Sequence, residues 1–126
     1  CVTVDVELDD ADLAGHLNAG EGFAFPSVER SEAFGISVLE AHACAKPVVA
    51  TRIGTGVEFA NPDGETGLNV APRDAAALAA AINRLLGDEA LRARLGTQAR
   101  DRVNREFHAR DIARREFDVY REVAGR

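Results

Sequence analysis

The spacing of apolar and polar side chains changes several times along the chain, and each change predicts a different element. Residues 2–8 alternate between apolar and polar side chains, which is the pattern of a strand with one face in water. Short unbroken apolar runs at 22–26 and 48–50 predict two further strands, and the segment 67–70, which follows a turn, predicts a third. The chain therefore places short strands at intervals that leave room for helices between them.

Helices are predicted where apolar residues recur every three or four positions. Asp9 with Asp10, and later Asp74, stand where a side-chain oxygen can accept a hydrogen bond from a free N–H at a helix start. Three glycines are expected to end helices, namely Gly20, Gly87 and Gly96. The predicted helices span about residues 11–18, 36–45, 75–86, 88–95, 97–106 and 109–123. The side chains expected to be buried in the last part of the chain are Phe107, Ile112, Phe117 and Tyr120.

Alternating strands and helices predict an α/β domain with a parallel sheet and helices on both faces. With 126 residues, 46% of them hydrophobic and 29% charged, the chain is long enough for one domain with a substantial core. No apolar run reaches the ~20 residues of a membrane-spanning helix, and the acidic, alternating start is not typical of a secretory signal. Cys1 and Cys44 form neither a disulfide framework nor a metal-ligand spacing. We therefore predict a cytoplasmic protein.

The charge of the chain is unevenly distributed around a net value of −6. Residues 1–30 hold seven acids and one arginine, whereas residues 92–115 hold eight arginines. Few aromatic residues accompany those arginines, so we expect a solvated helical face and no binding of nucleic acid. The acidic part includes Asp10-Ala11-Asp12, a pattern that can hold a divalent metal, but its position favours the start of a helix.

The segment with the most distinctive chemistry lies at residues 22–51. A strand is followed by a polar loop and, at Gly35, by the start of a helix, whose free N–H groups and dipole suit a phosphate or another anion. Glu32 precedes Gly35 by three residues and Glu40 follows it by five. Sugar hydroxyls could donate hydrogen bonds to these carboxylates. Alternatively, Glu40 is an ordinary exposed helix residue and Glu32 favours the helix N-terminus electrostatically; the residues alone leave both interpretations open.

Two segments of the chain resemble a known enzyme family. Glu32 and Glu40 are separated by seven residues within SEAFGISVLEAHACAKPVVAT, which is similar to the E-x7-E segment of retaining GT-B glycosyltransferases of family 4, also called group 1. The later DGETGLNVAPRD, residues 63–74, is similar to that family's D-G-x-x-G-L-x-V-x-P-x-D segment. The resemblance covers most of residues 2–123 and implies a Rossmann-like, incomplete C-terminal GT-B domain, the domain that binds the nucleotide-sugar donor.

The resemblance also implies roles for particular residues. The backbone amides of Phe34, Gly35, Ile36 and Ser37 would hold the donor's diphosphate and sugar. Glu40 would accept hydrogen bonds from the ribose, and Glu32 would be the catalytic carboxylate beside the donor sugar. The implied reaction transfers a sugar with retention from a UDP- or GDP-linked donor to a glycan or a lipid-linked acceptor, the latter at a membrane surface. No metal and no cofactor are implied.

The chain also departs from the family's pattern. Gly54-Thr55-Gly56-Val57-Glu58 stands where a Gly-Gly pair before Pro-Glu is usual, so the ligand contacts of that loop are open. The acceptor domain, the first two strand–helix units and a basic Arg/Lys pair have no counterpart in the sequence. The strand predicted at residues 2–8 would thereby lose its neighbours, and we expect it to pair with residues 22–26 or with a second copy of the chain.

Two other functions fit the sequence. Because the acceptor domain has no counterpart, the chain could be a non-catalytic nucleotide-sugar-binding fragment. It could also be part of another GT-B enzyme, such as a nucleotide-sugar epimerase.

Overall fold

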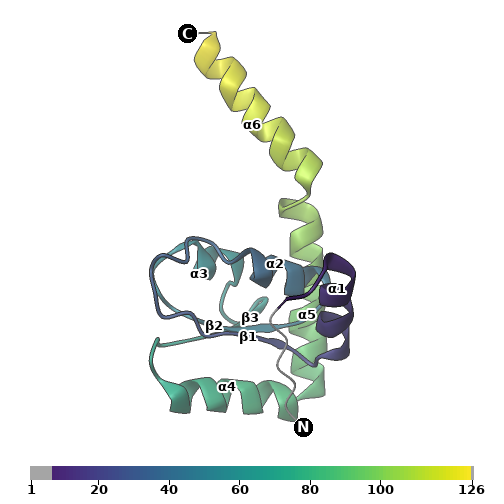
Figure 1. Ribbon diagram of the computed structural model, residues 1–126, viewed down its shortest axis with the longest axis vertical. Coiled ribbons are helices and arrows are strands. Elements are labelled where there is room, and N and C mark those ends of the chain that lie inside the picture. The colour runs from purple at the N-terminus through teal and green to yellow at the C-terminus, as the bar shows by residue number, and fades with distance from the viewer. Residues whose placement is uncertain (1–6, 126) are drawn as a thin grey trace.

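The fold of the chain is a three-stranded parallel sheet between layers of helices (Figure 1). The computed structural model describes residues 7–125. Strands β1 (Phe23–Phe25), β2 (Val48–Thr51) and β3 (Gly67–Val70) lie side by side in that order. Both pairings are parallel, with Phe23 beside Val48 and Val48 beside Gly67. The predicted α/β class and parallel sheet are confirmed.

Helices cover both faces of this sheet. Helices α2 (Ile36–Ala43) and α3 (Gly56–Ala60) connect consecutive strands and lie on one face, while α4 (Ala75–Gly87) lies on the other (Figure 1). Helix α1 (Asp10–Ala19) precedes the sheet, and α5 (Glu89–Glu106) packs against α2, α4 and β3. Helix α6 (Ala109–Ala124) projects away from this body. Among residues 7–125, no helix combines the length and the apolar character needed to cross a bilayer.

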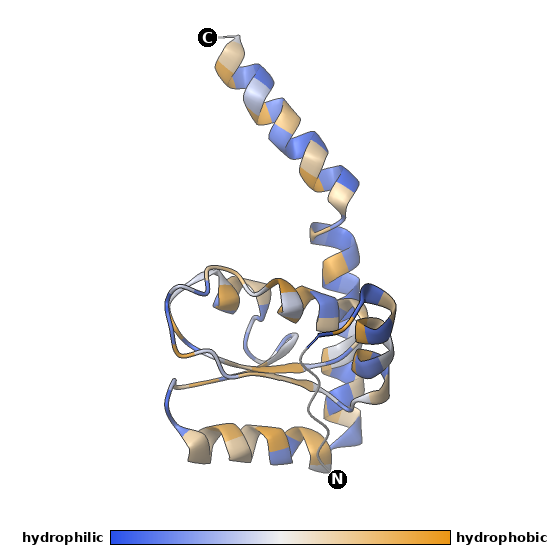
Figure 2. Cartoon of the chain, in the orientation of Figure 1, coloured by the Kyte–Doolittle hydropathy of each residue, from blue (hydrophilic) through white to orange (hydrophobic). Residues whose placement is uncertain are grey.

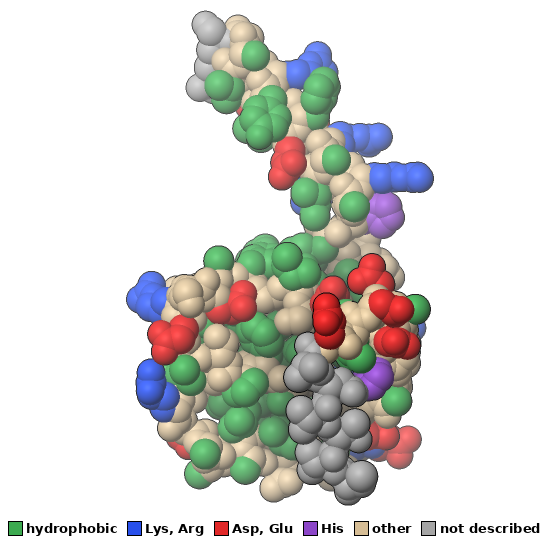
Figure 3. Space-filling model, viewed as in Figure 1, with side chains coloured by type: hydrophobic (Ala, Val, Ile, Leu, Met, Phe, Trp, Pro, Cys, Tyr) green, Lys and Arg blue, Asp and Glu red, His purple; other side chains and the backbone are tan. Residues whose placement is uncertain are grey.

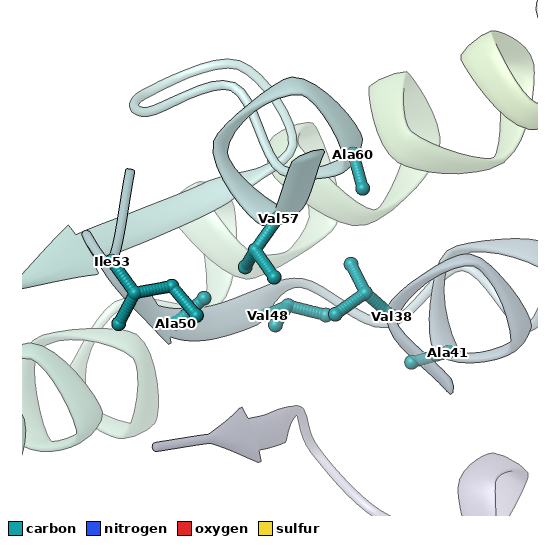
Figure 4. Packing of buried hydrophobic residues seen from close by; sticks show 7 residues of the cluster. All are labelled: Val38, Ala41, Val48, Ala50, Ile53, Val57 and Ala60. Carbon is teal, nitrogen blue, oxygen red and sulfur yellow. The ribbon is translucent and has the colours of Figure 1, made fainter. Parts of the chain in front are cut away.

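The central strand β2 explains why the core has two halves. Its side chains alternate, so that Val48 and Ala50 pack with residues of α2 and α3, whereas Val49 packs with residues of α4 and α5. Figure 4 shows the first of these clusters, in which Val38, Ala41, Val48, Ala50, Ile53, Val57 and Ala60 converge. The strands are accordingly coloured as hydrophobic in Figure 2, whereas α6 mixes hydrophobic and hydrophilic residues along its whole length.

The helix starts use the side chains that the sequence predicts. Asp9, Asp74 and Asp88 each accept a hydrogen bond from a backbone N–H three residues later, at 2.8–2.9 Å. Asp10 itself is the first residue of α1 rather than its cap, and Asp12 supplies the capped N–H. Gly20 ends α1 as predicted, with an extended backbone at φ −79° and with its N–H bonded to the carbonyls of His16 and Leu17.

Two sequence predictions about the second half of the chain are wrong, and one helix before it was missed. Helix α5 continues through Gly96 instead of ending there, because this glycine faces Ala45: a Cβ at Gly96 would lie 2.1 Å from the Ala45 carbonyl oxygen. The short helix α3 was not predicted at all. Finally, the side chains expected to be buried on α6 are exposed, Ile112 by 37%, Phe117 by 62% and Tyr120 by 71%, while Phe107 is half-buried.

Most of the strand predicted at residues 2–8 lies outside the described residues. Glu7 and Leu8, which are described, belong to no strand. In the described part of the sheet, β1 pairs with β2. The expected pairing of residues 2–8 with residues 22–26 or with a second copy of the chain stays a prediction.

Candidate functional site at the start of helix α2

The start of α2 is a sharp corner at the carboxyl end of the parallel strands, where ligands bind in open α/β sheets. Gly35 forms this corner with φ +78°, a left-handed conformation that favours glycine. A side chain would also be crowded, since a Cβ at Gly35 would lie 3.2 Å from Val38 Cγ2 and 3.3 Å from Phe25 Cε1. Strand β1 and helix α2 thus hold the backbone of the corner from two sides.

Glu32 is bound to this corner. The Gly35 N–H donates a hydrogen bond of 2.9 Å to Glu32 Oε1, and the Glu32 side chain is half-buried. The amide of Gly35 therefore already has a partner. Ile36 and Ser37 come next, and the first N–H groups of a helix have no acceptor within the helix itself. The positive end of the helix dipole lies at the same place.

Glu40 lies one helical turn further along, on the solvent side of α2. It is exposed, as is Ile36, which precedes it by four residues and is 71% exposed. Val38, Ala41 and His42, by contrast, are buried on the opposite side. At ~1.5 Å per residue, Glu40 is roughly 7 Å along the axis from Gly35. The open ridge of α2 therefore carries a carboxylate within the length of a small ligand from the corner.

The loop after β2 supports the corner from the side. The Gly56 N–H donates to the Ala33 carbonyl at 2.8 Å, and Arg30 donates to the Gly54 carbonyl at 3.3 Å. Thr55 caps α3, and Glu58 accepts a hydrogen bond from the Thr55 N–H in return. The Gly54-Thr55-Gly56 segment is thus the start of a helix that adjoins the candidate site, a role that its sequence did not reveal.

The far end of α2 contains a buried polar network that the sequence did not indicate. His42 and Asn61 are almost fully buried, with His42 Nε2 3.2 Å from Asn61 Oδ1. Asn61 also donates to the Val48 carbonyl at 3.2 Å and to Asn69 Oδ1 at 2.8 Å, and it accepts from Thr66 Oγ1 at 3.1 Å. Burial lowers the pKa of His42 to about 4; the hydrogen bond of its ring to Asn61 Oδ1 opposes this shift, and the charge of Arg102 reinforces it. The network therefore contains a neutral histidine and stabilises the packing of α2 against the sheet.

The same network explains part of the DGETGLNV segment. Asn69 Nδ2 donates to the Asn61 carbonyl, and Asp63 accepts from the Asn69 N–H, both at 2.8 Å. Gly67 leaves room for this arrangement, because a Cβ there would lie 2.0 Å from the Val48 carbonyl oxygen and 2.5 Å from Asn61 Oδ1. The residues of this segment therefore connect β2 and β3, away from the corner at Gly35.

The other residues considered in the sequence lie at the ends of helices, away from the corner at Gly35 in the chain. Asp10 and Asp12 lie in the first turn of α1, where acidic side chains favour the helix N-terminus. Cys44, half-buried, directly follows α2. Among residues 7–125, no three His, Cys, Asp or Glu side chains gather in an arrangement that could hold a metal ion.

Comparison with known proteins agrees with this architecture. The family described as "Glycosyl transferases group 1" matches residues 2–102. The O-antigen chain mannosyltransferase C of Escherichia coli is 39% identical over 102 residues, which are 81% of this chain and 28% of that enzyme. The chain thus spans less than a third of the length of this relative.

Solved structures give the same result. The sucrose-phosphate synthase of Thermosynechococcus elongatus superposes with a TM-score of 0.89 at 37% identity, over 98% of this chain and 30% of that one. Anabaena Alr3699/HepE in complex with UDP-glucose gives 0.81 at 25% identity, over 88% and 30%. The C-terminal domain of a group 1 glycosyl transferase, LpcC of Francisella tularensis, gives 0.74 at 25% identity, over 84% and 53%.

The family match covers well over half of the chain, and the fold is that of the C-terminal domains of GT-B glycosyltransferases. The chain therefore belongs to the group 1 glycosyl transferases, of which it represents part of the C-terminal domain.

Proposed function

We propose that this chain binds the nucleotide-sugar donor of a sugar-transferring enzyme at the start of α2. The observation that carries the proposal is the corner itself. A helix N-terminus opens at the carboxyl end of the parallel strands, with Glu32 bound to Gly35 and with Glu40 on the exposed ridge. The similar Anabaena protein contains UDP-glucose, which supports a nucleotide-sugar as the ligand class.

The diphosphate of the donor would lie against the first turn of α2. The amides of Ile36 and Ser37 supply N–H donors, and the helix dipole adds a favourable field for negative charge. We include Phe34 because its backbone directly precedes the corner. Gly35 contributes by holding Glu32, to which its N–H is bound. No divalent metal is required in this arrangement, since the backbone and the dipole carry the anion.

The two glutamates would hold the sugar-bearing parts of the donor. Glu40, on the solvent side of α2, would accept hydrogen bonds from the ribose hydroxyls. Glu32 keeps one carboxylate oxygen on the Gly35 N–H and would offer the other to the donor sugar. A transition state with positive charge at the anomeric carbon is stabilised by negative charge placed beside it in advance. We therefore propose Glu32 as the catalytic carboxylate and Glu40 as a donor-binding residue.

The complete reaction needs more protein than this chain contains. The chain spans 28–30% of the mannosyltransferase and of the sucrose-phosphate synthase it resembles. We propose transfer with retention from a UDP- or GDP-linked donor to a glycan or a lipid-linked acceptor, with the acceptor held by a second domain.

Calorimetric titration of the chain with UDP-glucose and GDP-mannose tests donor binding. We expect saturable binding of at least one of them, and Glu40→Ala should weaken it by about 1.5–3 kcal/mol, or roughly 10- to 150-fold, the range for charged hydrogen bonds. Glu116→Ala, at an exposed position of α6, is the matched control. Equal affinity of Glu40→Ala and Glu116→Ala, or no saturable binding of either sugar nucleotide, would contradict the proposal.

A sugar-transfer assay on a polypeptide that contains both GT-B domains tests the catalytic role of Glu32: Glu32→Ala should reduce kcat strongly and change KM little if Glu32 acts in the transition state. Equal kcat in that variant would remove the catalytic role from Glu32.

A further inference from the structure

Three phenylalanines and one arginine form a cluster beside the candidate site. The proposed function uses none of these four side chains. The rings of Phe34, Phe59 and Phe107 lie 6.0–6.3 Å apart between centroids, and two of the three pairs are edge-to-face. The guanidinium carbon of Arg102 lies 5.0 Å from the Phe59 ring centre and 5.1 Å from that of Phe107. We call these four side chains the aromatic cluster. They come from the loop before α2, from α3 and from the end of α5.

Arg102 is fixed within this cluster. It is 9% exposed, and its NH1 donates to the Ala60 carbonyl at 3.0 Å, at the end of α3. Its Nε lies 3.1 Å from Glu106 Oε2. A guanidinium this deeply buried is retained where its donors are satisfied and its charge is paired. Arg102 therefore joins the end of α3 to the end of α5 and holds the rings of Phe59 and Phe107 in place.

Phe34 connects the cluster to the corner of the candidate site. It is the residue directly before Gly35, and α3 packs tightly against it: a Cβ at Gly56 would lie 2.6 Å from the Ala33 carbonyl oxygen and 2.7 Å from Phe34 Cδ2. On the other side of the corner, Gly35 abuts the Phe25 ring of β1. The backbone between these two contacts has little room to shift. The direction of the N–H groups at the corner thus depends on where the Phe34 ring is seated.

We propose that Phe107 and Arg102 are positioning residues for the donor site, which act on the Gly35 corner through the ring of Phe34. This inference rests on the proposed function, because it concerns the site described there. An anion site built from backbone amides depends on how well those amides are held before the ligand arrives. Gly35 has no side chain to cap α2, so the precision must come from packing around it. The end of α5, about 70 residues away in sequence, supplies that packing.

Amide hydrogen exchange, measured by NMR on the 126-residue chain, tests the coupling without a ligand. In Phe107→Leu, the Gly35 N–H should exchange at least tenfold faster than in the original chain, because its hydrogen bond to Glu32 opens more often. Phe107→Tyr, which keeps the ring, should restore slow exchange. Phe117→Leu, at an exposed position of α6, is the matched control. The amides of β2 report global unfolding, so a merely structural role would raise exchange at β2 and at Gly35 together, whereas a positioning role raises it at Gly35 by a larger factor than at β2.

The variant Arg102→Lys provides a second route, with the exposed Arg114→Lys as its control. Lysine keeps the charge but loses the planar group over the rings. Exchange of the Gly35 amide should therefore again increase by a larger factor than exchange of the β2 amides. If Phe107→Leu does not fold, Phe59→Leu replaces it, because Phe59 is 59% exposed and tolerates truncation more readily. Gly35 exchange in these variants equal to that in their controls would overturn the inference.

Titration with UDP, followed at the amides of Gly35, Ile36 and Ser37, connects the cluster to binding. The apparent Kd for UDP should rise at least fivefold in Phe107→Leu and return in Phe107→Tyr. Unchanged UDP affinity in a folded Phe107→Leu chain would overturn the positioning role. A chain that does not bind UDP while Gly35 exchange responds as expected would overturn the nucleotide assignment and support the coupling. The two failures are therefore distinguishable.

Discussion

Helix α2 carries polar groups on an open side and on a buried side, and the two are treated in opposite ways. The open side comprises the corner at the helix start and the exposed ridge one turn further along: Glu40 is exposed, and only one oxygen of Glu32 has a described partner. On the buried side, His42 is almost fully buried and bonded to Asn61, which is bonded in turn to Val48, Thr66 and Asn69. The buried side satisfies its polar groups within the chain, so it stabilises the fold. The open side has capacity left for a ligand.

This difference separates residues that define the fold from residues that define function. Both sides belong to the segments by which the chain resembles group 1 glycosyl transferases, and the sequence does not distinguish between them. Burial and hydrogen bonding do: Asn69 and Gly67 complete the network under β2, whereas Glu40 contacts solvent. Substitutions on the buried side should therefore change stability, and substitutions on the open side should change binding.

The largest effect is expected for Gly67→Ala. The new Cβ would lie 2.0 Å from the Val48 carbonyl oxygen and 2.5 Å from Asn61 Oδ1, and neither can move without breaking β2 or the network. We expect a loss of about 4 kcal/mol in the free energy of unfolding, measured by urea denaturation. Gly15→Ala, where nothing lies within 4 Å of the new Cβ, is the control and should be neutral or slightly stabilising. A well-folded Gly67→Ala of normal stability would show that the network is not tightly packed.

The next largest effect is expected for Asn61→Ala. This change removes the partner that Asn61 supplies to His42 Nε2, Thr66 Oγ1 and Asn69 Oδ1 in a buried place, where each unsatisfied group costs about 1–3 kcal/mol. We expect a loss of about 3 kcal/mol by the same measurement. Asn104→Ala, exposed on α5, should change stability by less than about 0.5 kcal/mol. Similar stabilities of the two variants would mean that the buried side does not hold the fold.

A pH dependence of stability should follow from His42. Its pKa is about 4 in the folded chain and 6.5 when unfolded, so the unfolded chain binds more protons between these values. Stability is therefore fully present above pH 6.5 and is lost as the pH falls toward 4, by about 2 kcal/mol between pH 7 and pH 5. Urea denaturation at the two pH values measures the loss. His42→Gln should reduce it, and the exposed His108→Gln should not; an equal loss in both would exclude His42 as its source.

The smallest effect on stability is expected for Glu40→Ala, on the open side of α2. Glu40 is exposed, and surface substitutions change the free energy of unfolding by less than about 0.5 kcal/mol. Urea denaturation should show no more than this, although calorimetry should show the loss of donor affinity proposed above. A stability loss of 2 kcal/mol or more would instead make Glu40 part of the fold, and the contrast between the open and the buried side of α2 would disappear.

Much of the fold could be predicted from the sequence because its signals are local. The apolar run at residues 48–50, the caps Asp9 and Asp74, and the corner glycine at Gly35 each act through neighbours in the chain. Local backbone sterics and hydrogen bonding decide such features. The position of the candidate site could be predicted for the same reason, since a helix start after a parallel strand places its amides at the strand ends.

Other features were decided only by the tertiary structure. Glycine disfavours the interior of a helix, yet α5 continues through Gly96. The Ala45 carbonyl oxygen lies so close to Gly96 that no side chain fits there. The sequence did not indicate the buried position of His42, whose partner Asn61 lies 19 positions away. The apolar residues of α6 looked like core, but the described chain offers them no surface, and Figure 3 shows hydrophobic side chains uncovered along that helix. Periodicity tells which side of an element is apolar, whereas contacts between distant segments determine what covers it.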